Sequence, residues 1–584
     1  MSIRNLDAFF RPKAVALIGA STRPNAIGHV IAQNLMAAGF EGPVMPVNPN
    51  HSAVGGVLCY PDIARLPVTA DLAVICTPPE TVPGLISELG QRGTRGAIVI
   101  TAGFSELGNA EGKALQSAIL EAARPKCLRI VGPNCIGVIS TPAHLNASFA
   151  HVNAKPGSVA FAAQSGAMLT TILDWAAARS IGFSHLVSLG DMTDVDFGDT
   201  LDYLAADEST HAILLYIEAV TDPRKFMSAA RAAARTKPVI VVKAGRHAAA
   251  AKAASSHTGA LAGVDAVYEA AFRRAGVLRV LGLDELFDAV EILGTSKRLP
   301  GDRLAILTNG GGAGVLATDA LLDCGGILAD ISDDTTRALN SVLPPTWSRG
   351  NPVDIIGDAS PKRYADALNI LLRAPEVDGV LVLNCPTAVA SSTAAARAVI
   401  ETAEAVDRPV LTNWLGAFGA EEARGQFAAA GLPTFETPDK AVRGYTYLTR
   451  YRRAQEILME VPPSEPEAFV PDEAAARRII AEALDRRQAW LNEEQVHGIL
   501  SAYRIDAARS LLVGSIEDAV PRAAEFDGPI ALKIFSPDIT HKSDVGGVAL
   551  NLRADGIRAA CAAMQARVQK AAPHARIGGF VLQE

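Results

Sequence analysis

Short apolar runs alternate with longer amphipathic or alanine-rich stretches along most of the chain. A short apolar run that ends at a turn predicts a buried strand, and the stretch after it predicts a helix. The runs that predict strands are 14–18, 44–47, 72–75, 97–100, 158–163, 212–217, 238–243 and 304–307. Strands that alternate with helices in this way predict an α/β fold with parallel sheets, whose ligands bind at the carboxyl ends of the strands.

Breaks in this alternation predict several domains. The rhythm restarts at 158–163, residues 299–302 form a linker, and the prolines of 461–466 mark a hinge. The expected domains are residues 1–141, 142–298, 299–460 and 467–584. The first of them is expected to be Rossmann-like, because its strands and helices alternate from the start.

The last expected domain differs from the others. It combines a helical region with an α+β segment that includes the apolar run 530–534. Its final strand, 579–584, ends the chain with nothing after it, so we expect this domain to be incomplete.

Composition narrows the possible classes of protein. The chain has 584 residues, 49% hydrophobic and 20% charged, which is typical of a globular protein of about four domains. Only 5% of the residues are aromatic, so the cores must consist mostly of Ala, Val, Leu and Ile. The formal charge is −8 and no long basic run occurs, which argues against nucleic acid as a partner.

Targeting signals and cysteine pairs are not visible. Residues 1–11 lack the apolar run of a secretory signal, and no apolar stretch approaches the length of about 18 residues needed to span a membrane. The seven cysteines are scattered singly, which is typical of reduced thiols. We therefore expect a cytoplasmic protein without a membrane partner.

Three glycine-containing turns follow predicted strands and precede predicted helices. They are Gly19–Ser21, Gln164–Ala167 and Asn309–Gly314. Such a turn exposes backbone N–H groups at the positive end of a helix dipole and can bind phosphate. Each could equally be only a tight turn. The first is not a complete GxGxxG motif, so it indicates a dinucleotide site weakly.

A candidate nucleophile lies among small residues. His257 is flanked by serine, threonine and glycine after the alanine-rich run 248–254, and an open imidazole can accept and hand on a phosphoryl group. Glu218 ends the apolar run 212–217, where a carboxylate can orient an imidazole. A surface or capping histidine and an ordinary acid at a strand end remain the alternatives.

The string Lys533–Val548 carries the highest density of functional residue types. Lys533 belongs to an apolar strand from which it can reach nucleotide phosphates, and Lys542–Gly547 offers charge and flexible backbone to cover them. A surface lysine whose apolar stem is buried is the alternative for Lys533 alone.

Together these motifs resemble a known family. The first motifs occur in the order and at roughly the spacing found in the succinyl-CoA synthetase α subunit. The next resemble the C-terminal domain of the β subunit of that enzyme, and the last resembles the ATP-grasp part of ADP-forming acetyl-CoA synthetases. The motifs are Gly132–Val138, Gln164–Gly166, Ser256–Ala260, Asn309–Gly314, Asn351–Asp354 and Lys533–Val548. The resemblance covers nearly the whole chain, which is identified as a member of the NDP-forming acyl-CoA synthetases.

This resemblance implies a Rossmann-like CoA-binding domain, two flavodoxin-like ligase domains and the N-terminal part of an ATP-grasp domain. It also implies the ligands CoA, ATP or ADP, and Mg²⁺. The implied CoA-binding residues are Gly19, Ala20, Ser21, Gly28, Val47, Asn48, Pro49, Thr77, Pro78, Pro79 and Asn134. Phosphate would be held by Ser165, Gly166, Gly312, Ala313 and Gly314, and ATP by Lys533, Gln583 and Glu584.

The implied reaction joins a carboxylate to CoA with ATP, through acyl phosphate and phosphohistidine intermediates. His257 would carry the phosphoryl group, Glu218 would orient it, and His541 would relay phosphate. Magnesium ligands are not assigned, because the family places them in the second half of the ATP-grasp domain, which we expect to be absent here. A homo-oligomer is expected because the family assembles that way. Which acyl group is used does not follow from the resemblance.

Two other functions compete with this one. Bacterial protein lysine acetyltransferases share the domain order, and in some of them the ligase part is a degenerate acyl-CoA sensor; the presence of His257 favours a working ligase. A NAD-dependent dehydrogenase would use only the first domain, lacks a full dinucleotide motif here, and leaves the other domains unexplained.

Overall fold

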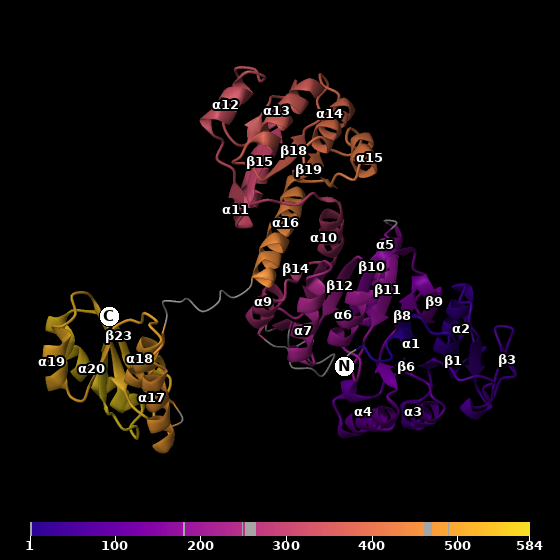
Figure 1. Ribbon diagram of the computed structural model, residues 1–584, viewed down its shortest axis with the longest axis horizontal. Coiled ribbons are helices and arrows are strands. Elements are labelled where there is room, and N and C mark those ends of the chain that lie inside the picture. Colours follow the sequence, from indigo (N-terminus) through magenta and orange to yellow (C-terminus); the bar gives the residue numbers. More distant parts are fainter. Residues whose placement is uncertain (1–2, 179–180, 248, 251–263, 461–469, 489) are drawn as a thin grey trace. The chain divides into compact units, whose positions relative to one another are not determined.

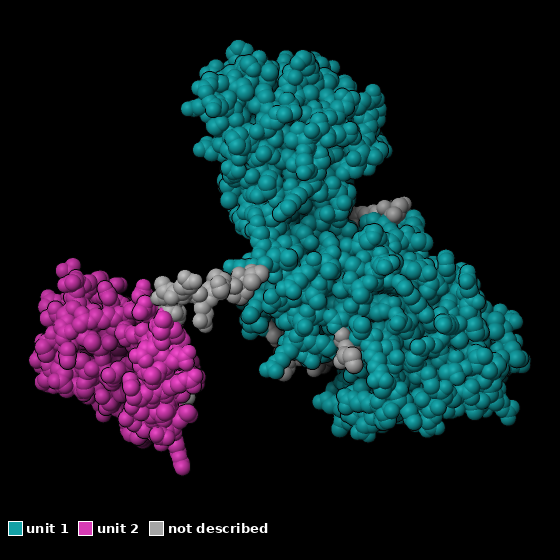
Figure 2. All heavy atoms as spheres, in the orientation of Figure 1, with its two compact units in different colours: residues 1–460 teal, residues 461–584 magenta. Residues whose placement is uncertain are grey.

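The computed structural model describes residues 3–178, 181–247, 249–250, 264–460, 470–488 and 490–584 (Figure 1). The chain forms two compact units, residues 1–460 and 461–584 (Figure 2). The predicted α/β fold is confirmed. Within the described ranges, no helix is long and apolar enough to cross a membrane. The predicted hinge at 461–466 lies outside the described residues.

The first sheet has five parallel strands in the order β2-β1-β5-β6-β7. Its strands are β1 (Val15–Ile18), β2 (Val44–Val47), β5 (Leu72–Ile75), β6 (Gly96–Val99) and β7 (Arg129–Val131). The accompanying elements are helices α1 (Asp7–Phe10), α2 (Ile27–Ala37), α3 (Val82–Gln91) and α4 (Ala110–Ala123), and the hairpin β3 (Ala53–Val54) and β4 (Val57–Leu58). Every residue of β1, β5 and β6 is buried, as expected for strands covered on both faces.

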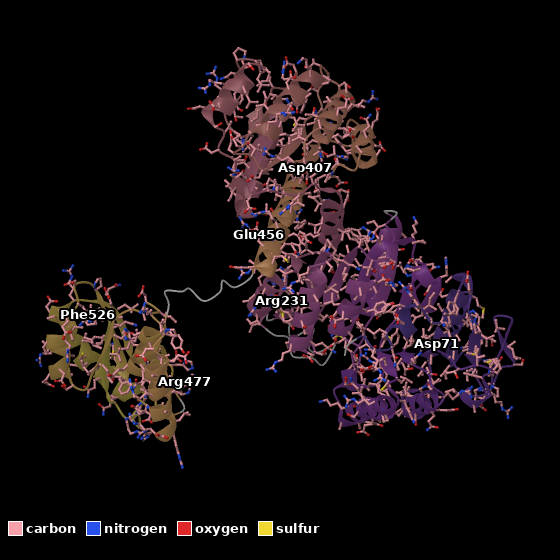
Figure 3. The ribbon with its side chains drawn as sticks, viewed as in Figure 1. Asp71, Arg231, Asp407, Glu456, Arg477 and Phe526 are labelled. Carbon is pink, nitrogen blue, oxygen red and sulfur yellow. The ribbon has the colours of Figure 1, made fainter. Side chains whose placement is uncertain are left out.

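Asp71 fixes the register between β1 and β5. It lies just before β5 and accepts hydrogen bonds from the backbone N–H groups of Lys13 and Ala14, just before β1 (Figure 3). Its other oxygen accepts from Arg95. These bonds align the two strands so that both end at the same edge of the sheet.

The second sheet has seven strands in the order β14-β13-β12-β10-β11-β8-β9. They are β8 (Gly137–Ser140), β9 (Leu145–Ser148), β10 (Pro156–Ala163), β11 (Phe183–Ser188), β12 (Ala212–Ile217), β13 (Val239–Lys243) and β14 (Leu278–Val280). Its helices are α5 (Gly166–Ala178), α6 (Phe197–Ala206), α7 (Pro223–Ala234), α9 (Asp265–Arg274) and α10 (Leu283–Thr295). Strand β8 pairs with β11 in antiparallel fashion, although its residues fall in the first domain expected from sequence.

The third sheet has six strands, with β16-β15-β18-β19-β20 in line and β17 beside β15. They are β15 (Arg303–Thr308), β16 (Ile327–Leu328), β17 (Val353–Asp354), β18 (Gly379–Asn384), β19 (Val410–Trp414) and β20 (Thr434–Phe435). Its helices are α11 (Gly311–Asp323), α12 (Asp333–Asn340), α13 (Pro361–Arg373), α14 (Ser392–Glu404), α15 (Glu421–Ala429) and α16 (Pro438–Met459). Helix α16 contacts both α10 and α11, and one apolar core contains residues from the second and the third sheet.

The second unit contains a four-stranded antiparallel sheet in the order β21-β24-β22-β23. Its strands are β21 (Ser510–Val513), β22 (Ile530–Phe535), β23 (Val548–Leu552) and β24 (Gly579–Gln583), and its helices are α17 (Glu473–Asp485), α18 (Glu493–Ala502), α19 (Ile516–Ala523) and α20 (Ile557–Ala571). Along β22, buried and half-buried residues alternate. One face of this sheet therefore forms the core with α19 and α20, and the other is accessible.

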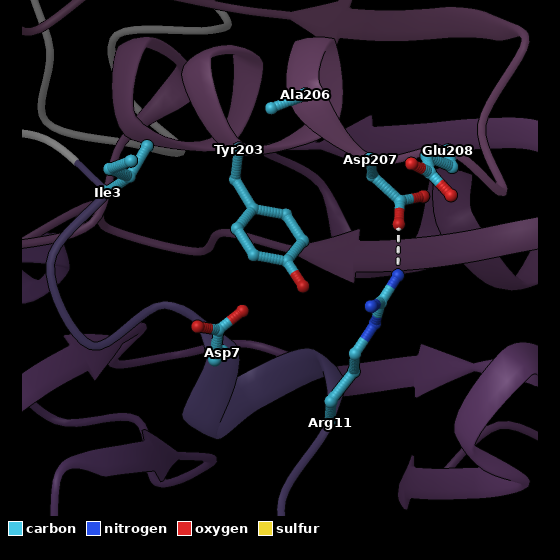
Figure 4. A pocket seen from close by; sticks show the side chains of 7 residues that line it. All are labelled: Ile3, Asp7, Arg11, Tyr203, Ala206, Asp207 and Glu208. Atoms are coloured by element: carbon cyan, nitrogen blue, oxygen red, sulfur yellow. Dashed lines mark hydrogen bonds and ion pairs between the residues drawn. The ribbon is translucent and has the colours of Figure 1, made fainter.

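A buried carboxylate joins the N-terminal helix α1 to the second sheet. Asp207 accepts a hydrogen bond from Arg11 (2.7 Å) beside a cavity of about 360 Å³ (Figure 4). It also accepts one from the ring of the buried His185 (3.1 Å). Burial raises the pKa of Asp207, but hydrogen bonds from His185 and two neighbouring hydroxyls outweigh it and hold the pKa well below its ordinary value. The cavity contains none of the predicted site residues.

Asp207→Asn should lower the free energy of unfolding of the first unit by about 2 kcal/mol at pH 7, because it removes a paired buried charge. A carboxylate with a lowered pKa stabilises the fold above its unfolded pKa of about 4, so the deficit should shrink as the pH falls below that value. Urea denaturation measures both effects. Glu208→Gln, on an exposed neighbour, is the control; equal stability of the two variants would contradict the role given to Asp207.

Candidate active site

A pocket of about 740 Å³ lies at the carboxyl ends of β1, β2 and β5. The order of the sheet reverses at β1, which is where ligands bind in sheets of this kind. The predicted CoA-binding residues that line this pocket are Gly19, Ser21, Gly28, Val47, Asn48, Pro49, Thr77 and Pro78. Ala20 is buried, and its carbonyl accepts a hydrogen bond from Asn48 (2.8 Å), while Pro79 begins a short 3₁₀ turn.

Helix α2 starts against the turn that follows β1. A Cβ atom on Gly28 would lie 2.1 Å from the carbonyl oxygen of Gly19, so only glycine permits this approach. The free N–H groups of the first turn of α2 therefore lie beside the pocket, where they can bind an anion.

Among the residues that the structure describes, one cationic side chain lines this pocket, and the sequence did not single it out. Arg23 belongs to the exposed segment between β1 and α2, whereas the other charged lining residues are Asp62 and Glu88. Because CoA carries several phosphate charges, Arg23 is the lining side chain that can pair with them.

A second pocket, of about 440 Å³, brings together several of the other predicted residues. Asn134, Ser165, Gly166 and Glu218 all line it. They follow β7, β10 and β12, so the pocket combines the carboxyl ends of strands from two sheets. Ile27 lines both pockets, which therefore adjoin.

Gln164 and Gly166 shape the second pocket. The buried Gln164 side chain accepts hydrogen bonds from the backbone N–H groups of Glu218 (3.1 Å) and Ala219 (2.9 Å) and so holds the end of β12. A Cβ atom on Gly166 would lie 2.4 Å from the Ile136 side chain, so a larger residue would displace the start of α5. Gln164 and Gly166 are thus needed in this motif for different reasons: the glutamine holds the end of β12, and the glycine lets α5 start close to Ile136.

His257 lies outside the described residues, but the elements on either side of its segment are described. Lys243 ends β13 and is 2% exposed; its ammonium lies 4.5 Å from the ring centre of Tyr268 on α9, and burial lowers its pKa. Arg279 on β14 pairs with Asp265 (2.5 Å) at the start of α9. These cations, which the sequence did not single out, fasten α9 to the sheet.

The phosphate-binding residues predicted in the third domain are not part of this pocket. Gly312, Ala313 and Gly314 form the first turn of α11, and the second pocket does not include them. That these residues hold phosphate together with Ser165 and Gly166 stays a prediction.

In the second unit, Lys533 lies on the accessible face of β22, opposite Val581 of β24. Gln583 pairs with Ala531, and the backbone N–H of Glu584 donates to the carbonyl of Arg509 (3.0 Å). His541 is exposed and precedes the 3₁₀ turn Lys542–Val545. The predicted roles of these residues in ATP binding and phosphate relay remain predictions. The described residues contain no cluster of three or more metal-binding side chains.

Four domain families match consecutive parts of the chain. They are a CoA binding domain (13–141), a succinyl-CoA ligase like flavodoxin domain (156–293), a ligase-CoA domain (304–459) and an ATP-grasp domain (482–584). The ADP-forming acetate–CoA ligase I of Archaeoglobus fulgidus is 39% identical over 99% of this chain and 82% of its own length. The chain belongs to the ADP-forming acyl-CoA synthetases.

Other members of the family support this assignment. The dinucleotide-forming acetyl-coenzyme A synthetase 1 of Ca. Korarchaeum cryptofilum, solved with phosphate and ADP, is 35% identical with a TM-score of 0.71, covering 79% of this chain and 99% of that one. The ADP-forming 4-hydroxybutyrate–CoA ligase of Nitrosopumilus maritimus is 32% identical over 93% of this chain and 78% of its own length. As an ADP-forming acyl-CoA synthetase, the protein is an acid–thiol ligase that uses CoA, ATP and Mg²⁺. The ligase prediction is thereby favoured over the acetyltransferase alternative.

Arg23→Ala should raise the KM for CoA about tenfold, because it removes the cation that lines the first pocket in the described part of the chain. The KM for the carboxylate should stay unchanged. Arg124→Ala is a matched control, since Arg124 is exposed and does not line the pocket. Steady-state kinetics with each substrate varied in turn measures the effect, and an unchanged KM for CoA would contradict the phosphate contact.

Proposed function

We propose that this protein makes a short acyl-CoA, with acetate as the first candidate acid, and releases ADP and phosphate. The main observation behind the proposal is that two pockets lie next to each other. The first contains the predicted CoA-binding residues, and the second is lined by Asn134, Ser165, Gly166 and Glu218. The apolar lining of the second pocket, Ile136, Phe149 and Met192, supports a small acyl group. The relatives named for acetate support the same choice.

The proposed reaction has three transfers. The γ-phosphoryl group of ATP passes by way of His541 to a ring nitrogen of His257, and ADP leaves. A carboxylate oxygen of the acid then takes the phosphoryl group from the histidine, which gives acyl phosphate. Finally the CoA thiolate attacks the acyl carbon, and phosphate leaves. His541 would relay the phosphoryl group from the ATP-grasp domain, and Mg²⁺ would neutralise charge on ATP.

The described residues have matching roles in this scheme. The N–H groups at the start of α5, around Ser165 and Gly166, can stabilise the charge of the phosphoryl group. Glu218, held by Gln164, would orient the imidazole of His257, and Asn134 would contact the acyl group. These contacts position the reactants and stabilise charge. Enzymes accelerate phosphoryl transfer mainly in these two ways.

Two properties of the whole protein belong to the same proposal. The family resemblance supports a homo-oligomer, and the scattered cysteines support a cytoplasmic setting.

Glu218→Gln should lower kcat about a hundredfold and leave the KM for CoA nearly unchanged, because it removes the charge that orients the imidazole. Glu121→Gln, on the exposed surface of α4, is the control. Chromatography of the full reaction with acetate, CoA, ATP and Mg²⁺ follows acyl-CoA and nucleotides together. Formation of AMP and pyrophosphate in place of ADP and phosphate would overturn the proposed function.

A further inference from the structure

Three consecutive backbone N–H groups follow strand β12, and side chains accept hydrogen bonds from all three. Gln164 accepts from those of Glu218 (3.1 Å) and Ala219 (2.9 Å). The N–H of Val220, the next along the chain, donates to the hydroxyl of Tyr268 (3.3 Å). Gln164 follows β10 and Tyr268 lies on α9, so the segment 218–220 is held from two separate elements. The two side chains thus form a clamp on this segment, which begins with Glu218.

A buried cation holds Tyr268 in place. The ammonium of Lys243 lies over the Tyr268 ring, 4.5 Å from its centre. Lys243 is 2% exposed, and its ammonium also donates a hydrogen bond to the carbonyl of Ala244. The face of an aromatic ring attracts a cation, and this attraction is strongest where water is excluded. Lys243 therefore fixes the ring that carries the hydroxyl of the clamp.

The second sheet brings these residues to one edge. Strands β12, β13 and β14 are parallel, so their carboxyl ends lie side by side. Lys243 ends β13 and pairs with Ile217, the last residue of β12, directly before Glu218. On β14, Arg279 pairs with Asp265 (2.5 Å) and so holds the start of α9 at the same sheet. The clamp is therefore built on strand ends and a fastened helix, which are rigid parts of the fold.

We propose that Tyr268 and Lys243 are positioning residues, which hold Glu218 where its carboxylate can orient an imidazole. Among the described residues, the linings of the two pockets include Glu218 but neither Tyr268 nor Lys243, so both act through Glu218. Without the hydroxyl, the N–H of Val220 loses its partner, and a displacement of about 1 Å in a positioned group slows a reaction strongly. This inference rests on the proposed function, since it takes Glu218 as the residue that orients His257.

Hydrogen exchange followed by mass spectrometry tests the clamp without catalysis. In Tyr268→Phe, which keeps the ring and loses only the hydroxyl, the backbone N–H of Val220 should exchange about tenfold faster than in the wild type. Lys243→Met should have the same effect, because the ring loses the cation that holds it. Tyr451→Phe, which removes the hydroxyl of a half-buried tyrosine of α16, is the matched control and should leave this rate unchanged. An unchanged rate in Tyr268→Phe would overturn the clamp.

Steady-state kinetics tests whether the clamp positions Glu218. Tyr268→Phe should lower kcat about tenfold and leave the KM for CoA unchanged, because it acts on the second pocket alone. In a Glu218→Gln background the same substitution should cause no further loss, since it acts through the carboxylate already removed. An unchanged kcat in Tyr268→Phe, or a further tenfold loss in the double variant, would overturn the positioning role. An unchanged kcat in Glu218→Gln alone would count against the proposed function, and the exchange rate would still decide on the clamp.

Discussion

The site depends on a short run of backbone hydrogen bonds that joins the first two sheets. The N–H groups of Asp191 (3.0 Å), Thr193 (3.2 Å) and Val195 (3.0 Å) donate to carbonyls in the segment 130–133, at the end of β7. The ion pair between Arg129 and Asp194 (2.8 Å) reinforces the contact. Two carboxyl edges that lie far apart in sequence thereby face each other, and the second pocket forms between them.

The charges of this pocket require explanation, because its expected ligands are anions and it contains acids. Glu218 and Asp191 would each repel a carboxylate or a phosphate if both were ionised and unscreened. The positive end of helix α5 opposes this repulsion, and burial raises the pKa of Asp191, which favours its neutral form.

Much of the site follows from local sequence. Apolar runs predicted the main strands, and the residues after them, such as Gly19, Ser165 and Glu218, lie at the carboxyl ends as expected. What sequence could not predict depends on which loops meet in space. Arg23 and Asp191 belong to no motif, and their importance arises only from the pockets that they line. The antiparallel pairing of β8 was missed for a related reason, since a short apolar strand gives no sign of its partner.

The central claim is that the phosphoryl group passes through the protein on its way from ATP to the acid. The most direct measurement is incubation of the full-length protein with γ-labelled ATP and Mg²⁺, without acid or CoA. We expect a label that is stable in alkali and labile in acid, that ADP discharges, and that His257→Ala does not acquire. A protein that binds ATP and forms acyl-CoA but never becomes labelled would contradict the account.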